Sequence, residues 1–270
     1  MKKLAVYFLA CVLMAPAAAD EERYTVGIIG TGSMGSASGT ALAEKGHRIV
    51  YGSRSPDSDK AKSVARDTGY GAIAVSQKEA AQRADIIVLA VPWFAVEDLI
   101  PTLGDLSGKI IVDITTADRQ GDDGYPEMAI ATSTSEMIRD WAPGARIVKT
   151  PFSAASTIRE PLAHGEPVAT WLAGDDREAK EIIAQLSIEL GLFPLDAGPL
   201  RMARTIDHLG FIYLTPLMQG RNHTWVLVPR VDIDMSCIDT EGWFEPVADR
   251  DNLARFPNLD ALPLECEDAD

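Results

Sequence analysis

The chain has 270 residues, enough to bury a full hydrophobic core in one large or two modest domains. Hydrophobic residues make up 46% and charged residues 24% of it, which excludes a wholly disordered chain. The formal net charge of −15 argues against nucleic acid and anionic membrane as partners.

The first residues have the three parts of a secretory signal in the right order. Lys2 and Lys3 precede an apolar run over 4–14, and the alanines at 17–19 offer a cleavage site. The run is too short to span a bilayer, and no other run approaches that length. We predict a signal peptide over 1–19 and a periplasmic location. An uncleaved anchor or buried first strand, and a cytoplasmic location, are the alternatives.

Strand and helix patterns then alternate along the chain. Strands are predicted over 24–30, 47–52, 71–75, 85–91, 109–115, 145–149, 167–173 and 192–196. Helices are predicted over 33–45, 56–68, 94–103, 134–141 and 176–190, at a capping box that opens at Ser76, and from near Leu200. Residues 117–131 and 151–166 lack a period, and the first of them is expected to be a loop near a ligand. This order predicts an α/β fold with a doubly wound, mostly parallel Rossmann sheet and a small C-terminal helical or irregular region.

A glycine-rich motif joins the first predicted strand to the first predicted helix. It consists of Gly30, Thr31, Gly32, Ser33, Met34 and Gly35. In such a motif the first glycine permits a tight turn, the second lets the backbone approach a pyrophosphate, and the third lets the helix pack closely on the strand. The N–H groups of the helix start bind the anionic pyrophosphate. The motif predicts dinucleotide binding, and a purely structural turn is the alternative.

The end of the second strand indicates which dinucleotide is bound. An NAD site usually has Asp or Glu about 20 residues beyond the glycines. This chain has Ser53, Arg54 and Ser55 there, so a guanidinium stands between two hydroxyl groups. A carboxylate would repel a 2′-phosphate, whereas Arg54 can bind it through paired charged hydrogen bonds. We therefore predict NADP(H), with a plain surface arginine as the alternative.

Ligands in such folds bind beyond the carboxyl ends of the strands. Val91, Pro92 and Trp93 follow the fourth strand and are predicted to border the cofactor, although packing alone could explain Pro92 and Trp93. Asp113 is expected to hydrogen-bond a loop. The catalytic residue is unknown from sequence. Lys149 is the candidate, because a cation at a strand end can neutralise an anionic ligand, and a surface lysine is the alternative.

The histidines give no metal signature. His47, His164, His208 and His223 are scattered, and neither H-E-x-x-H nor C-x-x-C occurs, so no metal site is predicted. His208 and His223 are open as acids or as hydrogen-bonded structural histidines.

The C-terminal part is acidic. Residues 231–270 hold twelve Asp or Glu against two Arg, a net charge of −10, which we interpret as a solvated tail. Cys237 and Cys266 lie in this tail and either pair or stay as free thiols. The predicted division is a signal over 1–19, an NADP-binding domain over 20–198, and a C-terminal substrate or dimer region over 199–270.

Several segments together resemble the NADPH-dependent coenzyme F420 reductase family, which also includes the cytoplasmic domains of membrane ferric reductases. The matching segments are GIIGTGSMG (27–35), YGSRS (51–55), ADIIVLAVPW (84–93), KIIVDIT (109–115), RIVKTPF (146–152) and DAGPLRMAR (196–204). The similarity covers about 24–225. It implies a Rossmann fold and hydride transfer from NADPH to a flavin-like acceptor.

The resemblance also implies roles for single residues. Thr31, Ser33 and Met34 would line the pyrophosphate, Ser53 and Arg54 would hold the 2′-phosphate, and Val91, Pro92 and Trp93 would border the nicotinamide. Two segments depart from the family near the reacting ring. Thr116-Ala117 replaces a common Asn-Pro, and Lys149-Thr150-Pro151-Phe152 replaces Lys-Ala-Phe-Asn. Residues 226–270 have no counterpart in the family.

The leading functional hypothesis is an NADPH-dependent oxidoreductase that transfers hydride to or from a flavin, a deazaflavin such as coenzyme F420, or a ferric acceptor. The first alternative is an exported NADP(H)-binding protein without turnover, because free NADPH is not expected outside the cytoplasm. Reduction of a small carbonyl or imine is a third, although that class has a longer helical second domain. A small-molecule substrate is expected, and a homodimer stays open.

Overall fold

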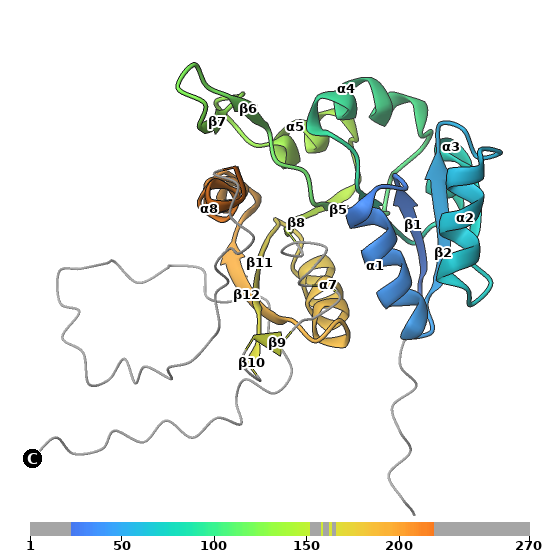
Figure 1. Cartoon of the computed structure of the whole chain (residues 1–270). Helices are drawn as coiled ribbons and strands as arrows, with labels where there is room; N and C mark the ends of the chain where they lie inside the picture. The colour runs from blue at the N-terminus through green and yellow to red at the C-terminus, as the bar shows by residue number, and fades with distance from the viewer. Residues whose placement is uncertain (1–22, 152–157, 159–161, 164–165, 219–270) are drawn as a thin grey trace, which may run out of the picture.

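The structure, a computed structural model, describes residues 23–151, 158, 162–163 and 166–218 (Figure 1). The predicted signal peptide, His164, His223, Cys237, Cys266 and the acidic tail lie outside the described residues. No helix within the described ranges is both long enough and apolar enough to cross a membrane.

One sheet of eight strands organises the described chain, in the order β12-β11-β8-β5-β4-β1-β2-β3. Its strands are β1 (Thr25–Ile29), β2 (Arg48–Ser53), β3 (Ile73–Ser76), β4 (Ile86–Leu89), β5 (Ile110–Asp113), β8 (Arg146–Lys149), β11 (Ala169–Ala173) and β12 (Phe193–Gly198). Every pairing is parallel except that of β11 with β8, which meets at Ala173 and Lys149. The predicted Rossmann fold class is therefore confirmed.

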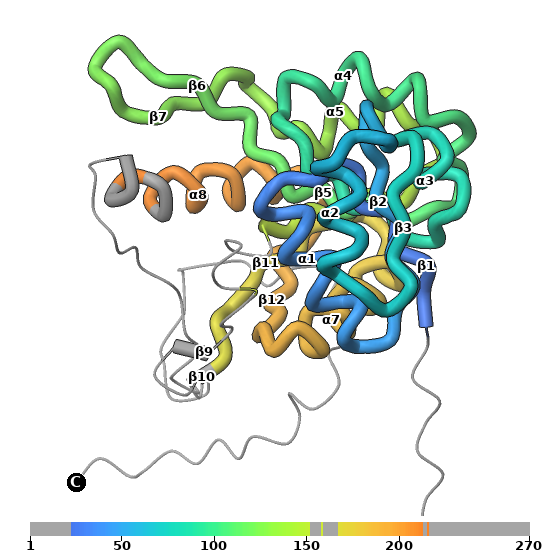
Figure 2. Tube along the Cα trace, turned by 45° about the vertical axis from the view of Figure 1, so that its right-hand side comes forward, coloured from blue at the N-terminus to red at the C-terminus, as the bar shows by residue number. Residues whose placement is uncertain are grey.

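Helices cover both faces of the sheet (Figures 1 and 2). They are α1 (Ser33–Glu44), α2 (Asp59–Thr68), α3 (Gln77–Arg83), α4 (Val96–Leu99), α5 (Thr134–Trp141), α7 (Arg177–Glu189) and α8 (Ala203–Met218). Helices α1, α2 and α7 share one hydrophobic core with side chains of the sheet, and α3, α4 and α5 share a second core. Because strands buried on both faces need apolar residues throughout, β1, β4 and β5 are near-continuous runs of Val, Ile and Leu.

The close approach of α1 to the sheet depends on Gly39. A Cβ atom at this position would lie 2.1 Å from the hydroxyl oxygen of Tyr51. Tyr51 is fully buried, and its hydroxyl group forms a 2.8 Å hydrogen bond with that of Thr68 on α2. Burial raises the pKa of Tyr51, against the lowering effect of its hydroxyl partners Thr68 and Thr40. Helix α1 can therefore pack over Tyr51 only because residue 39 is glycine.

Three local predictions were wrong in detail. The helix expected over 94–103 is broken into a 3₁₀ turn (Trp93–Ala95), α4 and a second 3₁₀ turn (Ile100–Thr102), because Pro101 has no N–H and its ring disfavours a regular helix. Helix α2 begins at Asp59 rather than near Pro56, since the Ser58 hydroxyl caps it by accepting from the Ala61 N–H at 3.3 Å.

The third concerns the expected loop over 117–131, which contains an antiparallel hairpin. It is formed by β6 (Asp118–Gln120) and β7 (Pro126–Met128), with Arg119 paired to Glu127 at 2.8 Å. The hairpin projects from the sheet beside α8 (Figures 1 and 2). A second small sheet, β9 (Leu162–Ala163) with β10 (Glu166–Pro167), lies in the stretch that was expected to be irregular.

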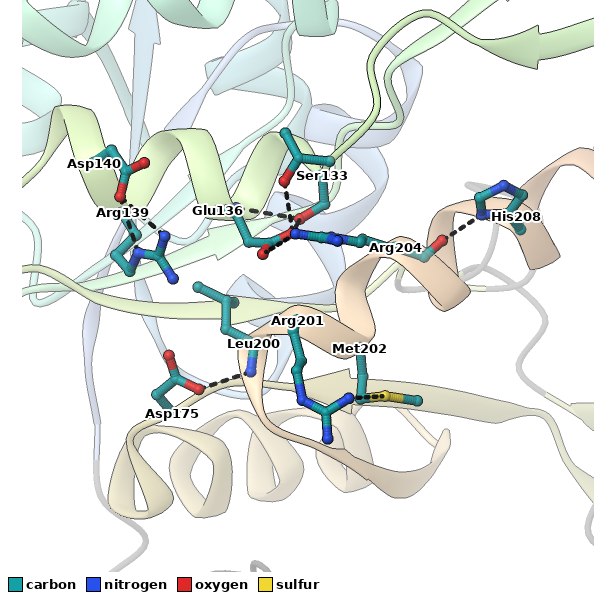
Figure 3. A network of polar contacts seen from close by, with 11 residues as sticks. Ser133, Glu136, Arg139, Asp140, Asp175, Leu200, Arg201, Met202, Arg204 and His208 are labelled. Atoms are coloured by element: carbon teal, nitrogen blue, oxygen red, sulfur yellow. Dashed lines mark hydrogen bonds and ion pairs between the residues drawn. The ribbon is translucent and has the colours of Figure 1, made fainter.

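Helix α8 follows a 3₁₀ turn (Leu200–Met202) and is tied to the Rossmann core by polar contacts (Figure 3). Arg204 donates to both oxygens of Glu136 on α5, at 2.7 and 2.8 Å, and the Leu200 N–H donates to Asp175 at 2.9 Å. Hydrogen bonds from Arg204 hold the pKa of Glu136 down at about 2 against the raising effect of burial. These contacts fix the start of α8 at the carboxyl end of the sheet.

Candidate dinucleotide cleft

A cleft of about 980 Å³ opens at the carboxyl ends of β1, β2 and β4. It contains most of the residues predicted from the sequence to bind a cofactor, namely Gly30, Thr31, Gly32, Ser53, Arg54, Ser55, Val91 and Pro92. Further lining comes from the start of α2, from Gln77 at the start of α3, and from the segment from Phe94 to Thr102. The cleft thus lies at the crevice where α/β sheets bind ligands.

The surroundings of the three motif glycines explain differently why each position holds glycine. Gly30 has φ +122°, and a Cβ there would lie 2.2 Å from the Ala90 carbonyl oxygen. A Cβ at Gly35 would lie 2.3 Å from the carbonyl oxygen of Gly30. A Cβ at Gly32 would meet no atom within 4 Å, and its φ of −82° suits any residue. The fold therefore requires glycine at 30 and 35 but not at 32, where the bare backbone leaves room for a ligand.

The start of α1 adds hydrogen-bond donors to the same place. The helix has 12 residues, no capping side chain at Gly32 and no acidic residue in its first turn. The first N–H groups of a helix have no partner within the helix, and the helix dipole makes this end positive. An anionic pyrophosphate beside Gly32 would satisfy both features.

The β2 side of the cleft is cationic. Arg54 and Lys60 both line it, and within the described ranges no ion pair involves either of them. Hydroxyl groups of Ser53, Ser55 and Ser58 stand beside them, although that of Ser58 also caps α2. Lys60 was missed from the sequence. The feature that could have indicated it is its position, because Lys60 is a cation in the first turn of the helix that follows the predicted phosphate-binding strand. Two cations without a carboxylate at the strand end fit a 2′-phosphate.

Four predicted cofactor residues do not line the cleft. Ser33 is exposed at the start of α1, Met34 packs against the core, and Gly35 is buried beneath the turn. Trp93 is half-buried, and its Nε1 donates to the Asp118 carbonyl at 2.9 Å, so it links the cleft rim to the β6–β7 hairpin. Phe94, which the sequence did not single out, lines the rim instead and is 70% exposed.

Lys149 is neither a surface lysine nor a residue of this cleft. Its side chain is 1% exposed, and its Nζ lies 2.7 Å from Asp207 and 3.6 Å from Asp113. It also donates to the Thr115 carbonyl. Burial by itself lowers the pKa of Lys149, but the two carboxylates outweigh it, so the pKa lies above its ordinary value. Asp113 accepts from the Thr115 N–H at 2.8 Å, in keeping with its expected contact to a loop.

The described histidines have structural contacts. His47 is buried, accepts from the Tyr24 N–H at 3.2 Å through Nδ1, and meets Glu189 at 2.8 Å through Nε2. The Nδ1 of His208 lies 2.6 Å from the Arg204 carbonyl oxygen. Among the described residues, no group of three or more His, Cys, Asp or Glu is placed to hold a metal ion.

Comparison with known proteins agrees with this geometry. The model of the family described as NADP oxidoreductase, coenzyme F420-dependent, matches residues 25–117, the segment from β1 to the end of the β5 loop. The match covers about a third of the chain. The resemblance inferred from the sequence is therefore confirmed over the segment that builds the cleft.

Individual relatives extend the likeness beyond that segment. Metalloreductase STEAP3 of Rattus norvegicus is 28% identical over 189 residues, which are 69% of this chain and 36% of that protein. The chain thus spans about a third of the length of this relative. A structure from Arthrobacter sp. FB24, described as an F420-dependent NADP reductase, has a TM-score of 0.66 at 24% identity and covers 73% of this chain and 96% of its own. A reductive aminase of Aspergillus terreus in complex with NADPH and ethyl-5-oxohexanoate, at 19% identity, has a TM-score of 0.55 and covers 74% of this chain and 64% of its own. The two structural likenesses show a shared fold.

Proposed function

We propose that the chain is an NADPH-dependent oxidoreductase that transfers hydride to or from a flavin, a deazaflavin of the F420 type, or a ferric acceptor. The carrying observation is the cleft that joins Gly32 at the start of α1 to Arg54 after β2 and Lys60 in the first turn of α2. The match of residues 25–117 to the model of the coenzyme F420-dependent NADP oxidoreductases supports the cofactor and the reaction class. The metalloreductase relative and the F420-dependent reductase structure support the range of acceptors.

The residues of the cleft would divide the binding task. Gly32 and the first N–H groups of α1 would hold the pyrophosphate, and Arg54 and Lys60 would hold the 2′-phosphate. Val91 and Pro92, beyond β4, would form the apolar border of the crevice. When bound, the dinucleotide supplies the hydride. The protein's part is to bind, orient and keep water away, which needs little acid–base chemistry.

Cofactor binding tests the first half of the proposal. Replacing Arg54 or Lys60 with Ala should weaken NADPH binding by about 10–100-fold, because each removes a charged hydrogen-bond partner of the phosphate. NADH binding should change by less than about threefold. Lys62→Ala is the matched control, since Lys62 is exposed on the same helix and pairs with Asp57 at 3.4 Å. Equal losses for NADPH and NADH, measured by titration calorimetry, would refute the 2′-phosphate assignment.

Turnover tests the second half. Purified protein should oxidise NADPH in the presence of at least one member of an acceptor panel that contains FMN, FAD, a deazaflavin and chelated Fe(III). A small ketone and a cyclic imine belong in the same panel, because a related fold occurs in the reductive aminase. Oxidation with the imine alone would replace the proposed acceptor class with that one.

A second candidate is an exported NADP(H)-binding protein without turnover. Two points favour it: the signal peptide predicted from the sequence, and the absence of Lys149, the candidate catalytic residue, from the lining of the cleft. Tightly bound NADP(H) that co-purifies, with no oxidation by any acceptor of the panel, would support this reading. Cell fractionation of the native host would test the proposed periplasmic location, and light scattering would test the proposed homodimer.

A further inference from the structure

A buried ionic cluster joins three elements at the carboxyl edge of the sheet. Asp113 is the last residue of β5, Lys149 is the last residue of β8 and its partner in register, and Asp207 lies on α8. Each of the three residues is at most 1% exposed. One ammonium group therefore faces two carboxyl groups in a site that solvent does not reach.

The two carboxyl groups are not equivalent. Asp113 accepts from the N–H and the hydroxyl of Thr115, at 2.8 and 2.7 Å, and from the Ser135 hydroxyl at 2.5 Å. Asp207 meets Lys149 through Oδ1 at 2.7 Å, but within the described part of the chain its Oδ2 is buried and has no hydrogen-bond partner. Both oxygens of Asp113 thus accept hydrogen bonds, whereas Asp207 keeps a buried oxygen that can take up a proton.

The electrostatics agree with this division. Burial raises the pKa of Asp207 to about 6, helped by the charge of Asp113 and opposed by Lys149 and by the neighbouring His208. When Asp207 is protonated the cluster is neutral, since Lys149 balances Asp113. When Asp207 is ionised the cluster carries one net negative charge. The change falls in the range of ordinary cellular pH.

The cluster lies on the side of the sheet where the second nucleotide of a dinucleotide would extend. Strand β5 neighbours β4, whose continuation through Val91 and Pro92 lines the cleft, and adjacent strands are about 4.8 Å apart. Lys149 holds the Thr115 carbonyl, and α8 passes Thr116 one turn after Asp207: a Cβ at Gly210 would lie 3.8 Å from the Thr116 hydroxyl. The cluster therefore lies on the β5–β8 side of the cleft, opposite the side that holds Arg54 and Lys60.

We infer that Asp207 is a positioning residue whose protonation sets the preference of the protein for the oxidised over the reduced cofactor. This inference rests on the proposed NADP(H) function. The nicotinamide ring of NADP⁺ carries a positive charge that the ring of NADPH lacks, so a negative cluster stabilises NADP⁺ selectively. A unit charge acting over about 10 Å, at an effective dielectric constant of roughly 20–40, changes the affinity ratio by about fourfold to 16-fold between the fully protonated and the fully ionised cluster.

The preference for NADP⁺ over NADPH is measured by the ratio of their dissociation constants. Both forms of the cofactor carry the same 2′-phosphate, whose own titration near pH 6 cancels in the ratio. We expect Kd(NADPH)/Kd(NADP⁺) of the full chain to be about threefold to tenfold higher at pH 8 than at pH 5. In Asp207→Asn the ratio should stay at its low-pH value throughout. Asp140→Asn, the same change on the exposed surface of α5, should behave as the wild type. His208→Gln should keep the pH dependence but move its midpoint to higher pH, because His208 lowers the pKa of Asp207.

A second measurement does not depend on a variant. NADP⁺ binding should release protons from the wild-type protein near pH 6 in excess of those released by NADPH, measured by calorimetry in buffers of different ionisation enthalpy. A flat ratio and equal proton release, with both forms bound, would overturn the inference and leave the proposed function intact. The same pH dependence in Asp207→Asn would also overturn it. Failure of both forms to bind at any pH would instead refute the proposed function.

Discussion

Gly32 offers a sharp test of whether the cleft binds a dinucleotide, because the fold does not explain it. In Gly32→Ala the new Cβ meets no protein atom within 4 Å. Alanine is a poorer N-cap than glycine by about 0.5–1 kcal/mol, and the lost flexibility of the unfolded chain returns about 0.4–1 kcal/mol. The free energy of unfolding should therefore change by less than about 1 kcal/mol. NADPH binding should weaken by more than about tenfold, since the methyl group occupies the approach of the pyrophosphate.

Gly39→Ala is the matched control on the same helix. Its Cβ would lie 2.1 Å from the hydroxyl oxygen and 2.6 Å from the ring carbon Cζ of the buried Tyr51. Overpacking of this kind costs about 1–3 kcal/mol, partly offset by the better helix propensity of alanine. We expect a melting temperature lower by about 2–8 °C and NADPH affinity within about threefold of the wild type.

Thermal unfolding without ligand and titration calorimetry with NADPH separate the two effects. Gly32→Ala should lose NADPH binding and keep its stability, whereas Gly39→Ala should lose stability and keep NADPH binding. Unchanged NADPH affinity in Gly32→Ala would refute the assignment of the cleft. A loss of stability in Gly32→Ala equal to that in Gly39→Ala would refute the claim that glycine at 32 serves a ligand and not the fold.

Two further predictions concern ion pairs that hold the C-terminal elements. Because the pKa of Glu136 is lowered to about 2, its pairing with Arg204 stabilises the fold above about pH 4.5 and is lost as the pH falls toward 2. Glu136→Gln should thus be less stable than the wild type at pH 7, by urea unfolding, and the difference should shrink toward pH 2; a constant difference would contradict this. Lys180 is buried and lies 2.8 Å from Asp196, so Lys180→Met should cost about 3–5 kcal/mol, and adding Asp196→Asn should recover part of it. No recovery in the double variant would show that lost packing, and not the loss of the ammonium group beside Asp196, is the cause.

The cofactor half of the site could be predicted from the sequence because its residues are close in the chain to the strands that position them. The motif from Gly30 to Gly35 follows β1 directly, and Arg54 follows β2. Parallel strands bring their carboxyl ends to one edge, so the order of elements was enough to bring these residues together. Trp93 was predicted to border the cofactor but does not line the cleft, because its indole N–H donates to the Asp118 carbonyl in the hairpin. No local sequence pattern indicates this contact.

The hairpin itself was missed for a similar reason. All three residues of β6 are exposed, so no apolar alternation marks the strand. Its pairing depends on backbone hydrogen bonds and on Arg119 with Glu127. Lys60 was missed because a lysine in the first turn of a helix can face either the cleft or the solvent. The sequence alone does not show which of the two the Lys60 side chain faces.

The sequence by itself determined the Rossmann sheet and the phosphate-binding edge, because buried strands need continuous apolar runs and a pyrophosphate turn needs glycine. Only the tertiary structure decided the state of Lys149. It placed Lys149, the candidate catalytic residue, at the centre of a buried cluster, by bringing Asp207 from a distant helix onto the ends of β5 and β8. Charge and pKa depend on burial and on partners in space, and these arise only when the last helix docks on the sheet.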